Sequence, residues 1–189
     1  MPPNVISVAS VVAAAAAAAA LLLLPGEAER GQAILLVFAG VFIQLRLLAN
    51  MLDGLVAIEG GLHSSSGDLF NEVPDRVDDV VILAAAGYAI PALAWAPALG
   101  WLAAVLALLT AYIRVLGDSL GAPQTFAGPM AKPHRMFILT VACAASIAEV
   151  ALRGYRGYVL AAALGVIVLG AAVTCVRRLL FIQGHLASR

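Results

Sequence analysis

Residues 5–24 read VISVASVVAAAAAAAALLLL, a run of twenty positions without a single charged side chain. A helix of about 20 apolar residues is long enough to cross the hydrocarbon core of a lipid bilayer. No Lys or Arg precedes the run, so it lacks the basic start that is typical of a cleavable signal peptide. We therefore predict that this stretch is a membrane-spanning helix that the protein retains.

The composition of the whole chain has the same character. Of its 189 residues, 63% are hydrophobic and 12% are charged, and the mean hydropathy is +1.01. A soluble domain carries about twice that charged fraction, so most of this chain must face lipid or other helices. The net charge of +0 says nothing about a nucleic-acid partner, and no basic run suggests one, so none is expected. Cys143 and Cys175 lie in apolar stretches, which predicts packing residues and not a disulfide or a metal pair.

Apolar stretches of similar length recur along the rest of the chain. They predict six membrane-spanning helices, over residues 5–24, 32–57, 68–90, 98–116, 134–152 and 158–180. Residues 25–31 and the Gly/Ser-rich residues 60–67 are predicted to be loops. Helices satisfy their own backbone polar groups in lipid, so the predicted fold class is an all-α integral membrane protein. Residues 1–189 would form a single domain of six transmembrane helices.

The distribution of basic residues predicts the orientation in the membrane. With six spans and the N-terminus inside, eight basic residues lie toward the cytoplasm and three lie outside. The eight are Arg46, Arg76, Arg114, Lys132, Arg135, Arg177, Arg178 and Arg189, and the three are Arg30, Arg153 and Arg156. This count favours cytoplasmic termini in a bacterial-type inner or cell membrane. The connection between the second and third spans would then also be cytoplasmic.

The acidic residues gather at the ends of the second and third predicted spans, in residues 46–79. Seven of the eleven lie there: Asp53, Glu59, Asp68, Glu72, Asp75, Asp78 and Asp79. Helical spacing places Arg46, Asn50, Asp53 and Ala57 on one face, and Asn71, Asp75 and Asp79 on one face of the next helix. Antiparallel packing of the two helices would bring Asn50 and Asp53 opposite Asn71 and Asp75.

Ionisable groups at membrane depth are costly and tend to mark a functional site. Oxygen atoms that converge from two helices are the ligands that Mg²⁺ or Mn²⁺ prefers. For Asp68, Asp78 and Glu59 the sequence leaves a second interpretation open, in which they only solvate helix ends in the headgroup region.

The spacing of this segment resembles the signature of the CDP-alcohol phosphatidyltransferase family, D-x2-D-G-x2-A-R-x8-G-x3-D-x3-D. The chain keeps every spacing and reads Asn50-x2-Asp53-Gly54-x2-Ala57-Ile58-x8-Gly67-x3-Asn71-x3-Asp75. Five positions match, whereas Asn50 and Asn71 replace aspartates and Ile58 replaces the arginine. Residues 3–7 (PNVIS), 111–114 (AYIR) and 131–135 (AKPHR) also resemble family segments. The amphipathic segment that usually precedes the first span in this family is missing, which leaves open a start further upstream.

The resemblance implies a role for each matched residue. Asn50, Asp53, Asn71 and Asp75 would bind two divalent cations, Mg²⁺ or Mn²⁺, which hold the diphosphate of a CDP-linked lipid. Asp75 would also be the catalytic general base on the incoming alcohol. The small residues Gly54, Ala57 and Gly67 would let the nucleotide approach the helices, and Arg114, Lys132 and Arg135 would face the acceptor. Glu72 and Asp79 could restore charge that the two Asn residues remove.

We therefore expect a transferase of phospholipid biosynthesis. It would move a phosphatidyl group from CDP-diacylglycerol, or a similar CDP-alcohol, to an acceptor alcohol within the lipid bilayer and release CMP. Family relatives are dimers, and the apolar outer faces are compatible with a homodimer but do not require one, so the oligomeric state stays open. Two other functions remain open: a non-catalytic relative that binds CDP-lipid without turnover, and a cation transporter that uses the same carboxylates. The identity of the acceptor stays open as well.

Overall fold

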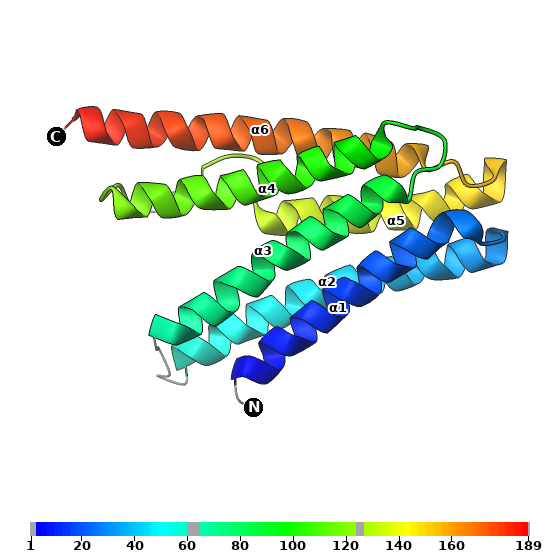
Figure 1. Cartoon of the computed structure of the whole chain (residues 1–189), viewed down its shortest axis with the longest axis horizontal. Helices are drawn as coiled ribbons and strands as arrows, with labels where there is room; N and C mark the ends of the chain where they lie inside the picture. Colours follow the sequence, from blue (N-terminus) through cyan, green and yellow to red (C-terminus); the bar gives the residue numbers. More distant parts are fainter. Residues whose placement is uncertain (1–2, 60–64, 124–126, 189) are drawn as a thin grey trace.

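The computed structural model describes residues 3–59, 65–123 and 127–188, with side chains from residues 8–52, 72–123 and 127–188. The described part consists of six α-helices and one short 3₁₀ turn, arranged as a bundle (Figure 1). They are α1 (Pro3–Leu23), η1 (Leu24–Gly26), α2 (Glu29–Glu59), α3 (Ser65–Tyr88), α4 (Ala96–Ser119), α5 (Lys132–Arg153) and α6 (Tyr158–Ala187). The predicted all-helical class and the count of six helices are confirmed. The two termini lie toward the same end of the bundle, as an even number of helices requires (Figure 1).

Several helices extend beyond the predicted spans. Residues 65–67, which we predicted to be part of a loop, form the first turn of α3, and α2 begins at Glu29 instead of residue 32. At the other end of the chain α6 continues to Ala187, seven residues past the predicted end. Hydropathy locates the apolar part of a helix, whereas the backbone hydrogen bonds continue into its polar ends. The remainder of the predicted loop, residues 60–64, lies outside the described residues.

Within the described residues, five helices are long and apolar enough to cross a membrane, namely α1, α2, α4, α5 and α6. Helix α3 carries six charged residues between Asp68 and Asp79, and its apolar part begins at Val80. Membrane-spanning character is thus supported for five helices, and for α3 it stays a prediction. A mixed helix can sit among the others only if its charges face protein partners instead of lipid.

Helix α1 separates α2 from α3, which the sequence did not predict. It packs against both of them, whereas α2 and α3 make few direct contacts with each other. Its buried face consists largely of alanine, including Ala14, Ala17 and Ala18, so its backbone can approach both neighbours closely. The expected antiparallel contact between α2 and α3 is thus replaced by a three-helix arrangement with α1 in the middle.

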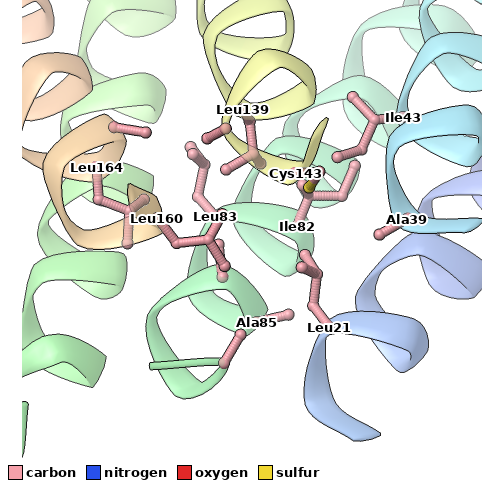
Figure 2. Packing of buried hydrophobic residues seen from close by; sticks show 14 of the residues in the cluster. Leu21, Ala39, Ile43, Ile82, Leu83, Ala85, Leu139, Cys143, Leu160 and Leu164 are labelled. Atoms are coloured by element: carbon pink, nitrogen blue, oxygen red, sulfur yellow. The ribbon is translucent and has the colours of Figure 1, made fainter. Parts of the chain in front are cut away.

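The core is apolar and draws on every helix. Figure 2 shows Leu21 of α1, Ile82 of α3 and Cys143 of α5 among its buried side chains. Cys143 and Cys175 are both buried free thiols. This confirms the prediction that neither forms a disulfide and that both pack as small apolar residues.

Two glycines allow α3 and α4 to touch backbone to backbone. A Cβ atom added to Gly100 would lie 2.8 Å from the Leu83 carbonyl oxygen and 2.9 Å from the Cα of Gly87. We expect Gly100→Ala to lower the free energy of unfolding by about 1–3 kcal/mol, because the two backbones must move apart. Gly165→Ala is the matched control, since an added Cβ meets nothing within 4 Å there. Thermal unfolding in detergent measures both, and equal stability of the two variants would contradict this packing.

Candidate active site

Arg46 is the centre of a buried ionic cluster between α2 and α3. Its side chain is 0% exposed and its guanidinium reaches three carboxylates of α3. Nη2 lies 3.4 Å from Asp75 Oδ1, Nε lies 3.4 Å from Asp78 Oδ2, and Nη1 lies 2.8 Å from Asp79 Oδ1. The contact with Asp79 is a close ion pair whose angles are not those of a hydrogen bond. Nη2 also donates a hydrogen bond of 2.9 Å to the Asp75 carbonyl, which fixes the guanidinium in the cluster.

Two cations from the start of α5 complete this cluster. Arg135 is buried and donates from Nη2 to Asp79 Oδ2 at 2.7 Å, while Lys132 pairs with Asp75 Oδ2. Pro133 lies in the first turn of α5, where its missing N–H costs no helical hydrogen bond. The helix therefore begins at Lys132 and presents both basic residues to α3. Arg46, Lys132 and Arg135 thus face Asp75, Asp78 and Asp79, three positive charges against three negative charges.

Ser10 of α1 links the second helix to the third. Its hydroxyl donates to Asp78 Oδ2 at 2.9 Å, and its Oγ also lies 3.3 Å from Asn50 Oδ1, so the shorter hydrogen bond is the one to Asp78. Asp78 is buried by these contacts and does not solvate a helix end, which resolves one of the interpretations that the sequence left open. The link also explains how Asn50 and the α3 carboxylates gather at one place although their helices barely touch.

Glu72 stands at the outer edge of the same site. It accepts hydrogen bonds from Arg76, one turn along α3, and from Arg114 of α4, whose Nη2 lies 2.8 Å from Glu72 Oε1. Burial by itself raises the pKa of Glu72, but the attraction of Arg76 and Arg114 outweighs this effect and holds the pKa below its ordinary value. Glu72 is therefore a carboxylate at neutral pH, and it ties α4 to the polar half of α3.

A polar cavity of about 340 Å³ opens between α3, α4, α5 and α6 beside this cluster. Its charged lining residues are Glu72, Asp75, Arg76, Arg114, Lys132, Arg135 and Arg178. Five cations against two carboxylates make the cavity suited to an anion. Arg178 donates to the carbonyls of Thr110 and Ala127, and within the described part of the chain no carboxylate pairs with it.

The structure brings together part of the predicted site. Arg114, Lys132 and Arg135, which were predicted to face the acceptor, line one cavity with Asp75. Glu72 and Asp79, the predicted compensating acids, are each paired with two cations. The remaining predicted residues are Asp53, Gly54, Ala57, Gly67 and Asn71, and their side chains lie outside the described residues. Their assigned roles stay predictions.

Among the described residues, the implied donors Asn50 and Asp75 do not fit the pair of divalent ions that the resemblance implies. Asn50 and Asn71 offer neutral amide oxygens, and both oxygens of Asp75 already face a cationic side chain. An ion bound to Asp75 Oδ1 at about 2.1 Å would lie no more than about 5.5 Å from Arg46 Nη2. At an effective dielectric constant of about 20, that repulsion is about 6 kcal/mol. Among the described side chains, no group of three or more His, Cys, Asp or Glu residues is arranged to hold a metal ion.

Sequence reasoning missed the three residues that organise the site: Arg46, Ser10 and Arg178. Arg46 was placed on the polar face of its helix but given no role, and Arg178 was counted only as a cytoplasmic charge, although each follows a long apolar stretch of its helix. An arginine at that depth needs a buried partner, and this requirement was the available signal. Ser10 gave no such signal, because serine is common in helices that pack closely in membranes.

Solved structures with a known activity share this fold. The phosphatidylinositol phosphate synthase (PgsA1) of Mycobacterium tuberculosis, solved with manganese and citrate, aligns with a TM-score of 0.73 and 20% identity over 97% of this chain and 83% of that chain. The same synthase with CDP-DAG bound aligns with a TM-score of 0.70 and 19% identity, over 96% and 86% of the two chains. Its apo form gives a TM-score of 0.71 and 20% identity, over 97% and 90%. No family model and no curated protein matches the sequence. At this level of identity the likeness establishes a shared fold.

Proposed function

We propose that this chain is a membrane transferase that moves a phosphatidyl group from CDP-diacylglycerol, or a similar CDP-alcohol, to an acceptor alcohol. One observation carries the proposal: Asp75, the last position of the signature, borders a cation-lined cavity in a fold shared with a synthase that binds CDP-DAG. We assign the reaction to the cytoplasmic face of a bilayer, because the distribution of basic residues favours cytoplasmic termini and the cluster belongs to the same end of the predicted spans.

In this proposal Asp75 is the general base. One of its carboxylate oxygens takes the proton of the acceptor hydroxyl as the acceptor oxygen forms a bond to the phosphorus that carries the lipid. The bond from that phosphorus to the bridging oxygen of the diphosphate breaks, and CMP leaves with the electron pair. Arg46 and Lys132 hold the carboxylate from two sides, so its oxygens are fixed at the edge of the cavity. Arg76 and Arg114 supply positive charge at the cavity, where the reacting phosphates would gather.

The cavity favours an acceptor alcohol that itself carries a phosphate. Arg178 is the strongest support, because the residue lines the cavity and its guanidinium donates only to carbonyls among the described residues. A planar guanidinium binds phosphate oxygens in a bidentate manner and retains its charge under all ordinary conditions.

We expect Arg114→Gln to raise the KM for a phosphorylated acceptor by about tenfold or more, with a smaller effect on kcat. A hydrogen bond to a charged group contributes about 1.5–3 kcal/mol, which corresponds to this range. Arg177→Gln is the matched control, since Arg177 is exposed on α6 and does not line the cavity. Steady-state kinetics with the acceptor varied measures the effect, and an equal KM in both variants would remove Arg114 from acceptor binding.

The test of the proposal is acceptor-dependent release of CMP by the purified protein in detergent. CDP-diacylglycerol is supplied with Mg²⁺, with Mn²⁺ or with EDTA, and each acceptor alcohol is added with and without its phosphate group. Release with one acceptor supports the transferase and identifies its product. Binding of the CDP-lipid without release under any of these conditions supports a non-catalytic relative. The substitutions at Asn50, Ile58 and Asn71 are the observation that favours that second candidate.

A further inference from the structure

We infer that Arg46 and Lys132 provide at Asp75 the positive charge that divalent cations provide to an intact signature, so that the chain binds CDP-lipid without a divalent cation. The inference rests on the proposed function for the identity of the ligand. It rests on the structure for the charge balance and for the positions of the two side chains.

The signature carries less negative charge in this chain than in its intact form. The intact pattern has four aspartates, whereas this chain has Asp53 and Asp75 at two of the positions and asparagine at the other two. An amide oxygen remains a possible ligand but brings no negative charge to offset a divalent ion. Two divalent ions would therefore face half of the carboxylate charge that the intact pattern supplies.

Arg46 already serves as the counter-cation of the carboxylates on α3. It lies one helical turn before Asn50, on the same face of α2, and it is fully buried against the carboxylates of Asp75, Asp78 and Asp79. With Lys132 and Arg135 it makes the cluster neutral by formal charge. A buried and neutral cluster gains little from an added cation, which would meet the fixed guanidinium at short range.

A CDP-lipid in the cavity would contact exposed cations and not Arg46. Arg46 itself is not accessible, so it acts as a positioning residue that holds Asp75 in place. Lys132 is 19% exposed in the side chain and lines the cavity, and Arg76 and Arg114 line it as well. Ammonium and guanidinium groups bind phosphate oxygens directly, which lets the protein offset the charge of a diphosphate with its own side chains.

The experiment measures Mn²⁺ binding by electron paramagnetic resonance and CDP-diacylglycerol binding by calorimetry, both on the full chain in detergent. For the natural sequence we expect little bound Mn²⁺, and a CDP-lipid affinity that changes by less than about twofold between Mn²⁺ and EDTA. We expect the double variant N50D/N71D to bind Mn²⁺ at least about tenfold more tightly, because ligand charge sets the affinity of such sites. Adding R46A should tighten Mn²⁺ binding further, and the double variant keeps the test valid where the triple variant does not fold.

Two outcomes would overturn the inference: stoichiometric Mn²⁺ binding by the natural sequence, or CDP-lipid binding that EDTA abolishes. Unchanged Mn²⁺ affinity in N50D/N71D would also count against it. The Mn²⁺ measurement needs no lipid, so it tests the charge balance even where CDP-lipid fails to bind. Failure of CDP-lipid binding under all conditions would instead overturn the proposed function.

Discussion

Asp75→Asn is expected to lower the rate of CMP release by about a hundredfold to ten-thousandfold, the usual contribution of a positioned general base. The amide that replaces the carboxylate cannot accept the proton of the acceptor hydroxyl. Because Asn has nearly the same size and the Asp75 side chain is partly exposed, the variant should keep the fold. We expect the loss in kcat, with CDP-lipid binding retained. Measuring kcat and CDP-lipid affinity on the same preparation separates the two effects.

Asp118→Asn is the matched control, because Asp118 lies near the end of α4 and is absent from the lining of the cavity. Its rate should remain close to that of the natural sequence. A full rate in Asp75→Asn, with both variants equally stable, would show that another group takes the proton. The catalytic role would then have to move to a residue beyond the ionic cluster.

Arg46→Met is expected to lower the free energy of unfolding by about 3–5 kcal/mol, the usual cost of leaving buried charge without its partner. Methionine preserves most of the apolar stem but leaves Asp78 without a cationic partner among the described residues. Asp79 is still paired with Arg135, and Asp75 is still paired with Lys132. The loss of stability therefore arises mainly from the unpaired carboxylate of Asp78. Thermal unfolding of the purified variants in detergent measures the change.

A second substitution sharpens this prediction. In the double variant R46M/D78N the unpaired carboxylate is gone, and the amide oxygen introduced by D78N can still accept the hydrogen bond of Ser10, so part of the stability should return. Arg177→Met is the surface control and should change stability by less than about 0.5 kcal/mol. If Arg46→Met were as stable as that control, the ionic cluster would not be the organising feature of the bundle.

Hydropathy was sufficient to predict the number of helices and the end of the bundle at which the polar residues gather. The runs of apolar residues are long, and bilayer thickness fixes how many residues a spanning helix needs. Helical spacing also placed Arg46 and Asn50 on one face of α2. Resemblance to family segments outside the signature, residues 111–114 and 131–135, then identified Arg114 and Lys132, which line the same cavity as Asp75.

Hydropathy could not predict which helices are neighbours. All apolar helices are equivalent in such a pattern, whereas close packing depends on the shapes of their faces. The alanine-rich α1 fits between α2 and α3, and this position makes Ser10 part of the site. For the same reason Arg46 was counted as a cytoplasmic charge instead of the centre of a buried cluster. The charges of α3 could be assigned only after their partners on α2 and α5 were known.

The most direct test of the proposed transferase follows the phosphorus atom itself. CDP-diacylglycerol labelled in the phosphate next to the lipid is incubated with the protein and the acceptor that gives the fastest CMP release, and the products are separated by mass. We expect one labelled phospholipid that contains the acceptor for each CMP formed, and with Asp75→Asn we expect both products to form at least about a hundredfold more slowly. Label that stays in CDP-diacylglycerol, or appears only in phosphatidic acid, would contradict transfer to an alcohol.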